Sequence, residues 1–131
     1  MVKGSVILAD SHQNLLEGIR GLLETTFETV VMVADKKSLF EAAEKLQPRL
    51  AIVDLSLPVS GEVNVAREVK SRYPDLKFII LSIHDEPVAV SEVMSEGASG
   101  FVLKRSIAND LFPAVRAALK GRTYISPSLA V

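Results

Sequence analysis

The chain has 131 residues, 48% of them hydrophobic, and a formal net charge of −1 at pH 7. This length suits one domain with one core, and the near-neutral charge argues against a nucleic-acid-binding surface, which needs clustered Lys and Arg. The chain has no cysteine, which excludes disulfides and thiolate metal sites, and no apolar run long enough to span a membrane, so we expect a soluble, cytoplasmic protein with no membrane partner.

Short apolar runs, rich in β-branched residues, alternate with amphipathic segments along the chain. The runs predict strands buried on both faces, and apolar residues at helical spacing predict a helix after each of them. The last helix is expected to begin near Asn109, because Pro113 is tolerated in a first turn and not in a helix interior. In chain order, the strands are expected at 6–9, 29–34, 50–54, 77–81 and 101–103, and the helices at 15–27, 38–46, 63–72, 87–97 and 109–120.

This alternation of strands and helices predicts a parallel sheet, because successive right-handed βαβ units place helices on both faces of such a sheet. The expected α/β fold is a flavodoxin-like (βα)5 doubly wound sheet in a single domain, with the strand order 2-1-3-4-5. Ligands of such sheets bind at the carboxyl ends of the strands, at the point where the order reverses between strands 1 and 3.

Four of the predicted strands end on a polar side chain. Asp10, Asp54, Ser82 and Lys104 follow strands 1, 3, 4 and 5, and parallel strands would bring them to the same edge of the sheet. Two neighbouring carboxylates repel each other, and Mg²⁺, which prefers oxygen ligands, would relieve that repulsion. A phosphoryl group on Asp54 would be offset by Mg²⁺ and Lys104, while the Ser82 hydroxyl would donate a hydrogen bond to it.

These residues resemble the receiver domains of two-component response regulators, especially those of the NarL/FixJ type with a LuxR-type output domain. The resemblance implies a receiver domain at 1–121, and a tail at 122–131 that is either a free end or the start of a linker to a DNA-binding domain absent from this chain. The blocks that carry the resemblance cover nearly the whole chain and lie at 6–10, 52–58, 80–82 and 97–104.

The resemblance also implies roles for single residues. Asp54 matches the phospho-acceptor, Lys104 the phosphate-pairing lysine, Ser82 the switch hydroxyl and Phe101 the switch aromatic. The implied partners are a sensor histidine kinase and a second copy of the chain, and DNA only through the absent domain. The implied output is transcriptional, and the implied protein is not an enzyme.

The implied Mg²⁺ site departs from the family pattern at Ser11. By resemblance, Asp10, Asp54 and the backbone carbonyl of Ser56 hold the ion, but the family has a second acidic residue where this chain has Ser11, and that residue usually contacts Mg²⁺ directly. Ser11 is either a weak substitute ligand or only the N-cap of the first helix. The loop from Asp54 to Gly61 also looks one residue shorter than the family pattern.

Three other functions stay open. A pseudo-receiver, favoured by Ser11, would act as a dimerisation module without Mg²⁺-dependent phosphorylation. A haloacid-dehalogenase-like phosphatase would use Asp54 as nucleophile, but it needs a second acid where this chain has Ser56, and a flavin-binding module would need a phosphate loop after strand 1. His12 and His84 lie in loops near the predicted site and could bind a transition metal or sense pH, although loop histidines usually do neither.

Overall fold

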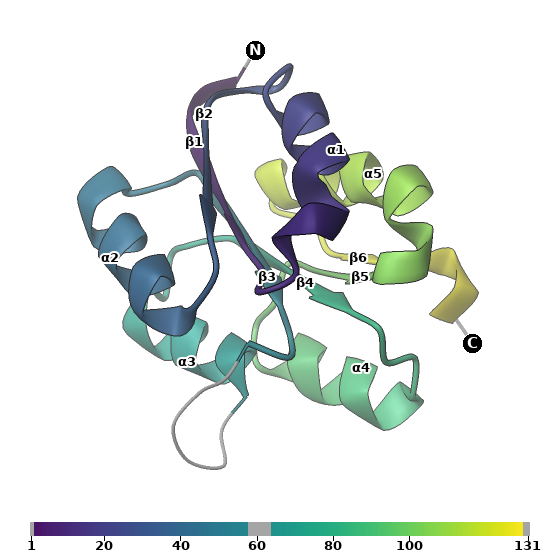
Figure 1. Ribbon diagram of the computed structural model, residues 1–131. Helices are drawn as coiled ribbons and strands as arrows, with labels where there is room; N and C mark the ends of the chain where they lie inside the picture. The colour runs from purple at the N-terminus through teal and green to yellow at the C-terminus, as the bar shows by residue number, and fades with distance from the viewer. Residues whose placement is uncertain (1, 58–63, 130–131) are drawn as a thin grey trace.

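Within residues 2–57 and 64–129, which the computed structural model describes, a six-stranded parallel sheet has two helices on one face and three on the other (Figure 1). The strands are β1 (Val2–Ala9), β2 (Phe27–Val33), β3 (Leu50–Asp54), β4 (Phe78–Ser82), β5 (Gly100–Leu103) and β6 (Tyr124–Ile125). The helices are α1 (Gln13–Leu23), α2 (Lys36–Leu46), α3 (Val65–Arg72), α4 (Pro87–Ser95) and α5 (Ile107–Leu119), with 3-10 turns η1 (Lys104–Ser106) and η2 (Pro127–Leu129).

The strand order is β2-β1-β3-β4-β5-β6, so the predicted doubly wound fold and the order of its first five strands are confirmed. β1 and β3 are neighbours at the centre of the sheet, where Ala9 pairs with Val53. β6 is an addition that the sequence did not predict, and it pairs with β5 through Tyr124 and Ile125. A strand of two residues is too short to show a periodic pattern, so only the structure reveals it.

The strands β3, β4 and β5 are buried along their whole length because they present apolar side chains to both faces of the sheet. In β3, Ile52 lies in the core that α1 and α5 cover, whereas Val53 lies in the core that α2, α3 and α4 cover. Burying one such side chain contributes about 1.5–3 kcal/mol, so these two cores account for much of the stability of the sheet. Among the helices that the structure describes, none is both long and apolar enough to cross a membrane.

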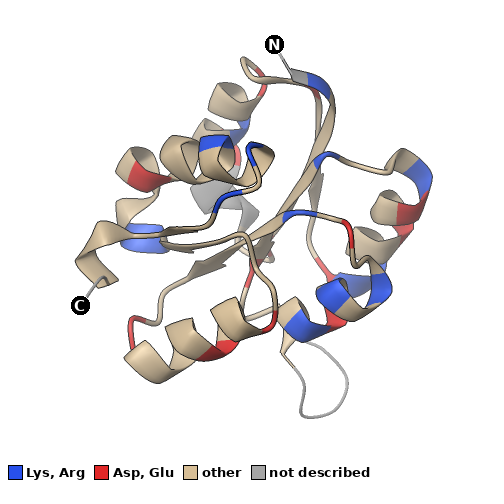
Figure 2. Ribbon diagram, turned by 180° about the vertical axis from the view of Figure 1, so that it is seen from behind, with Lys and Arg blue, Asp and Glu red and all other residues tan. Residues whose placement is uncertain are grey.

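The charges on α1, α2 and α3 are mixed in sign, whereas α4 carries Glu92 and no basic residue. Figure 2 shows acidic and basic residues side by side on the same helices. Arg20 lies 3.2 Å from Glu24, one turn along α1, and Lys36 of α2 lies 3.5 Å from Glu68 of α3. Such surface pairs contribute at most about 1 kcal/mol each, so these ion pairs add little to the stability that the two cores provide.

Several predicted helix boundaries are wrong. α5 begins at Ile107, directly after η1, so Pro113 lies inside the helix and not in its first turn. Proline lacks the N–H that would donate to the carbonyl of Asn109, but Asn109 is exposed, so water can bind that carbonyl. Phe27 opens β2 and is not part of α1. The predicted start of the third helix, at 63, lies outside the described residues.

Candidate functional site

The structure brings the four polar strand ends together at the carboxyl edge of the sheet. Asp10 follows β1, Asp54 and Ser82 are the last residues of β3 and β4, and Lys104 follows β5. The side chains of Asp10, Asp54 and Lys104 are only 1%, 2% and 8% exposed, and Ser82 is also buried. Charged side chains are this deeply buried only when they are paired, so their mutual contacts determine the chemistry of the edge.

The ammonium group of Lys104 joins the two carboxylates. Its Nζ lies 2.7 Å from Asp10 Oδ2 and 3.2 Å from Asp54 Oδ2. Asp10 Oδ2 accepts no well-directed hydrogen bond from any residue that the structure describes, so at this oxygen the contact with Lys104 is an ion pair. One positive charge therefore faces two negative charges, and the three groups together retain a net negative charge.

Ser56 holds the carboxylate of Asp54 through two hydrogen bonds. The backbone N–H of Ser56 donates to Asp54 Oδ1 at 3.0 Å, and the Ser56 hydroxyl donates to Asp54 Oδ2 at 2.8 Å. Burial raises the pKa of Asp54, but the hydrogen bonds from Ser56 and the charge of Lys104 outweigh it, so the pKa lies below its usual value. Asp54 is therefore ionised at neutral pH, which is the state that a carboxylate nucleophile requires.

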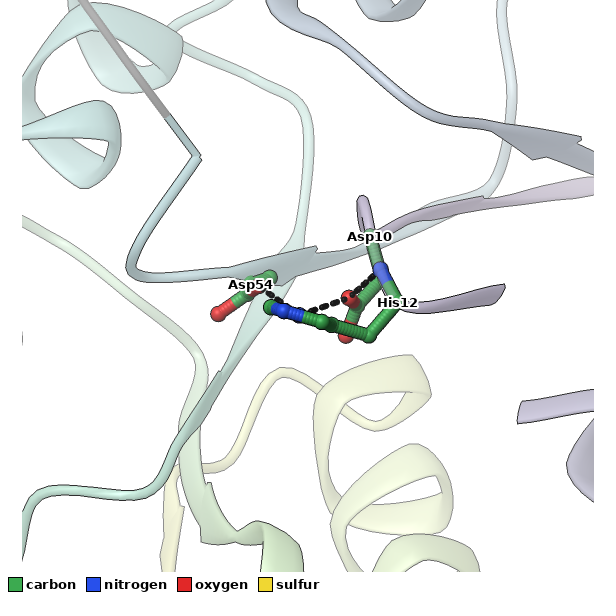
Figure 3. A group of neighbouring side chains, drawn as sticks. All are labelled: Asp10, His12 and Asp54. Atoms are coloured by element: carbon green, nitrogen blue, oxygen red, sulfur yellow. Dashed lines mark hydrogen bonds and ion pairs between the residues drawn. The ribbon is translucent and has the colours of Figure 1, made fainter. Parts of the chain in front are cut away.

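His12 reaches the same carboxylates from the loop between β1 and α1. Its Nδ1 lies 3.4 Å from Asp10 Oδ1 and 3.9 Å from Asp54 Oδ2, and Figure 3 shows the ring extending from this loop toward Asp54. The backbone N–H of His12 donates to Asp10 Oδ1 at 2.7 Å. Ser11 is exposed, and α1 has its N-cap at His12, so the alternative in which Ser11 caps this helix is wrong.

A cavity of about 290 Å³ opens beside Asp54. Ser82 lines it, and its hydroxyl oxygen accepts a 2.9 Å hydrogen bond from the backbone N–H of His84. The remaining lining residues are His12, Ser56, Ile83, His84 and Lys104. Larger hollows of about 390 and 410 Å³ lie beside α2 and α3, but they share no residue with this edge of the sheet. The small cavity is therefore the one that a reactant of Asp54 would enter.

Phe101 lies on β5, and Ser126 follows β6 in the tail that pairs with β5. Phe101 is fully buried in the core beneath α2, α3 and α4. The buried Ser126 donates its N–H to the Phe101 carbonyl at 3.0 Å, and its hydroxyl accepts from Leu103 N–H at 3.1 Å. Ser126 and the hydroxyl of Ser56 are contacts that the sequence analysis missed. A serine two positions after an aspartate was the available signal for Ser56, whereas nothing in the pattern singles out Ser126.

The donor atoms at this edge suit a divalent cation. Asp10, His12 and Asp54 each offer one ligand atom, and these three atoms lie within 4.8 Å of one another. The two carboxylates are oxygen donors of the kind that hard cations prefer, and the backbone carbonyl of Ser56 follows Asp54 by two residues. The residues present therefore fit a divalent ion, with an imidazole nitrogen beside the oxygen donors.

The sequence matches the model of the response regulator receiver domain family over residues 6–116. It is similar to the transcriptional regulatory protein DegU of Brevibacillus brevis, with 36% identity over 97% of this chain and 55% of that protein. It is also similar to the probable transcriptional regulatory protein NarL of Mycobacterium tuberculosis, with 32% identity over 97% of this chain and 60% of that protein. The chain thus spans a little more than half the length of these curated relatives.

Solved structures show the same likeness. The isolated REC domain of RcsB from Salmonella enterica serovar Typhimurium, determined with the phosphomimetic BeF3−, has a TM-score of 0.86 and 30% identity, over 98% of this chain and 96% of that chain. A LuxR-family two-component response regulator from Aurantimonas sp. SI85-9A1 has a TM-score of 0.85 and 27% identity, over 98% of this chain and 93% of that chain. The likeness therefore extends over the whole sheet and its helices.

Proposed function

Because the chain belongs to the response regulator receiver domains, with relatives of the NarL/FixJ type as the sequence predicted, we propose that it accepts a phosphoryl group on Asp54 from a sensor histidine kinase. The observation that carries this proposal is the contact of Asp54 Oδ2 with Lys104 at 3.2 Å, beside a cavity that Ser82 also lines. An ionised carboxylate, an ammonium group and a hydroxyl at one cavity are the groups that form and hold an aspartyl phosphate.

In the proposed reaction, a carboxylate oxygen of Asp54 attacks the phosphorus of the kinase phosphohistidine. A P–O bond forms while the P–N bond breaks, and the ring nitrogen of the histidine keeps the electron pair and takes up a proton. Lys104 offsets the charge of the phosphoryl oxygens, and Ser82 donates a hydrogen bond to one of them. Mg²⁺ held by Asp10, Asp54 and the Ser56 carbonyl would supply further positive charge when it is bound.

Phosphorylation would be transmitted through Ser82 and Phe101. The Ser82 hydroxyl oxygen now accepts from His84 N–H, in the segment that leads to α4. If the Ser82 side chain turns toward the phosphoryl group, its oxygen moves away from His84 N–H, the segment loses this contact with the end of β4, and α4 moves with it. Phe101, packed in the core that α4 covers, would respond by changing its rotamer. The role of these two residues is that of a switch.

The proposed output is control of transcription by a cytoplasmic regulator. The relatives DegU and NarL are transcriptional regulators by name, and one RcsB structure contains two dimers bound to two DNAs. In this proposal, 1–121 is the receiver domain, which forms homodimers and is not itself an enzyme, and 122–131 leads to a separate DNA-binding domain. Tyr124 and Ile125 of this tail are held by the sheet, because β6 pairs with β5.

The proposal is tested by incubating the protein with acetyl phosphate, with and without Mg²⁺, and measuring intact mass. An Mg²⁺-dependent phosphoryl adduct is expected on the natural chain and on Asp85→Ala, whose carboxylate is exposed and pairs with Arg105. No adduct is expected on Asp54→Ala. An adduct that persists in Asp54→Ala would contradict the assignment of the acceptor.

A second candidate is a pseudo-receiver that dimerises without being phosphorylated. It is favoured by the loop after β1, where Ser11 replaces the second acidic residue of the family pattern and His12 lies beside the carboxylates. The same mass measurement separates the two candidates. A chain that is dimeric in analytical ultracentrifugation, but takes no phosphoryl group from acetyl phosphate with any divalent ion, would be a pseudo-receiver.

A further inference from the structure

We propose that His12 is a ligand of the divalent cation at this edge, so that the site binds first-row transition ions through Asp10, His12 and Asp54 and does not depend on all-oxygen coordination. The proposal deepens the proposed function, because it concerns the same site and the same two carboxylates. The expected ion of this fold is Mg²⁺. The proposal adds transition-metal ions that bind imidazole nitrogen, such as Zn²⁺ and Co²⁺, to the ions that the site can hold.

The distances between the three donor atoms carry the proposal. His12 Nδ1 lies 3.4 Å from Asp10 Oδ1 and 3.9 Å from Asp54 Oδ2. Two ligands on one ion with bonds of about 2.1 Å lie roughly 3–3.5 Å apart in octahedral or tetrahedral geometry. The separation from Asp10 Oδ1 already lies in this range, whereas His12 Nδ1 and Asp54 Oδ2 would have to approach by roughly 0.4–0.9 Å. The side chain of His12 is 70% exposed, so its ring is free to make that movement.

The backbone of His12 is anchored beside the carboxylates. The His12 N–H donates to Asp10 Oδ1 at 2.7 Å, which places the root of the side chain directly beside the buried carboxylate. His12 is also the N-cap residue of α1, and its side chain makes no capping hydrogen bond. The imidazole therefore has no structural role in the helix that would compete with binding an ion.

The charge balance at the edge leaves room for a cation. The two carboxylates carry two negative charges, and Lys104 supplies one positive charge. Asp10 Oδ2 faces Lys104, whereas Asp10 Oδ1 faces His12, so the lysine and the imidazole occupy different sides of this carboxylate. A divalent ion on the His12 side would bring the sum of formal charges to a positive value that suits an incoming phosphoryl group.

The choice of ion follows from ligand chemistry. Mg²⁺ takes oxygen ligands and keeps several waters, so it gains little from an imidazole. Imidazole suits Zn²⁺, and Co²⁺ and Ni²⁺ bind nitrogen donors more tightly than Mn²⁺ does. This site has two carboxylates and a histidine, with Ser11 in place of a third carboxylate. We therefore expect His12 to be needed for binding transition ions but not for binding Mg²⁺.

The test titrates CoCl2 and MgCl2 separately into the natural chain, His12→Ala and His84→Ala, with calorimetry for affinity and visible absorption for the coordination of Co²⁺. His84→Ala is a matched control, because His84 lines the same cavity but pairs with Glu86, at 3.7 Å. We expect His12→Ala to weaken Co²⁺ binding about tenfold or more and Mg²⁺ binding less than about twofold. His84→Ala should leave both affinities within about twofold of the natural chain.

Three results would overturn the proposal: equal weakening of both ions by His12→Ala, which would mean a general electrostatic effect; no effect of His12→Ala on Co²⁺; or no binding of Co²⁺ by the natural chain. Nitrogen-15 NMR gives a second measurement, since Zn²⁺ should shift Nδ1 of His12 and not that of His84. Phosphorylation of His12→Ala by acetyl phosphate with Mg²⁺ is read separately. If His12→Ala is phosphorylated and its ratio of Co²⁺ affinity to Mg²⁺ affinity equals that of the natural chain, the proposed function stands and this inference is rejected.

Discussion

The two halves of the site differ in how their side chains are positioned. On the β3–β4–β5 side, Asp54, Ser82 and Lys104 are buried and lie at the ends of paired strands. On the β1–α1 side, Ser11 and His12 are exposed and lie in a loop. Sheet register and burial fix the positions of the first group, whereas the exposed loop places fewer constraints on the second. The departure from the receiver pattern at Ser11 falls in this second half.

Asp10 belongs to both halves. It directly follows a central strand and is buried, yet one of its oxygens faces Lys104 and the other faces His12. The buried half thus presents positive charge and a hydroxyl to an anion, and the exposed half presents donor atoms to a cation. The comparison predicts that substitutions in the buried half change stability strongly, and that substitutions in the exposed half change ion binding with little effect on stability.

Lys104→Met should have the largest effect on stability. Removing the ammonium group leaves two buried carboxylates facing each other, and breaking a buried ion pair in this way typically costs about 3–5 kcal/mol. Because the cavity admits water, we expect the free energy of unfolding to fall by about 3 kcal/mol, at the lower end of that range. Urea denaturation at pH 7 measures it, and a divalent cation should recover part of the loss. A decrease below about 1 kcal/mol would mean that the carboxylates are already compensated by solvent.

Ser126→Ala tests whether the tail stabilises the end of β5 in the buried half of the site. The substitution removes the hydroxyl that accepts from Leu103 N–H and leaves this N–H unpaired next to Lys104. An unsatisfied buried donor costs about 1–3 kcal/mol, so we expect a loss of about 2 kcal/mol in urea denaturation. Ser128→Ala, at an exposed position of the same tail, is the matched control and should change stability by less than about 0.5 kcal/mol. Equal effects of the two substitutions would mean that the Ser126 hydroxyl does not stabilise the end of β5.

Ser56→Ala should raise the pKa of Asp54, because it removes one of the hydrogen bonds that lower it. In the natural chain the folded-state pKa is below the ordinary value of 3.8, so ionised Asp54 stabilises the fold above that pH, and the contribution is lost as the pH falls through the folded pKa. The variant should lose about 1 kcal/mol at pH 7 and begin to unfold at a higher pH on acidification. Carbon-13 NMR of the carboxyl group measures the pKa directly. If the pKa of Asp54 is unchanged in the variant, the Ser56 N–H and Lys104 alone account for its being lower than the ordinary value.

His12→Ala should have the smallest effect on stability. The side chain is mostly exposed and makes no capping hydrogen bond, so thermal unfolding should shift by less than the equivalent of about 0.5 kcal/mol. A loss as large as that of Lys104→Met would contradict the division of the site into a buried half and an exposed half, since it would make the imidazole a structural cation.

The fold was predictable because its strands are short apolar runs that alternate with helices, and this pattern depends only on burial. The ends of elements were less predictable. The second helix was expected to begin at 38, but α2 begins at Lys36, because the carboxylate of Asp35 caps it by accepting from the Ser38 N–H at 2.7 Å. Pro113 predicts that α5 begins near Asn109, but local sequence does not show that η1 leads directly into the helix at Ile107.

The predicted site was correct in which strand ends meet, since parallel register alone brings Asp10, Asp54, Ser82 and Lys104 to one edge. The roles of these residues in phosphorylation remain predictions. The direction of the His12 ring and the contact of Ser126 with Leu103 N–H depend on loop and tail conformations, which have no periodic signal in the sequence.

The pairing of β6 with β5 also bears on aggregation. A sheet edge with unpaired N–H and C=O groups is a template for pairing with other chains. Here the tail occupies the outer edge of β5, because Ser126 N–H binds the Phe101 carbonyl and the Ser126 hydroxyl binds Leu103 N–H. β6 itself is only two residues long and is soon followed by Pro127, which has no N–H to offer. A chain shortened to residue 121 would expose an apolar strand edge, so the tail protects the sheet against edge-to-edge association.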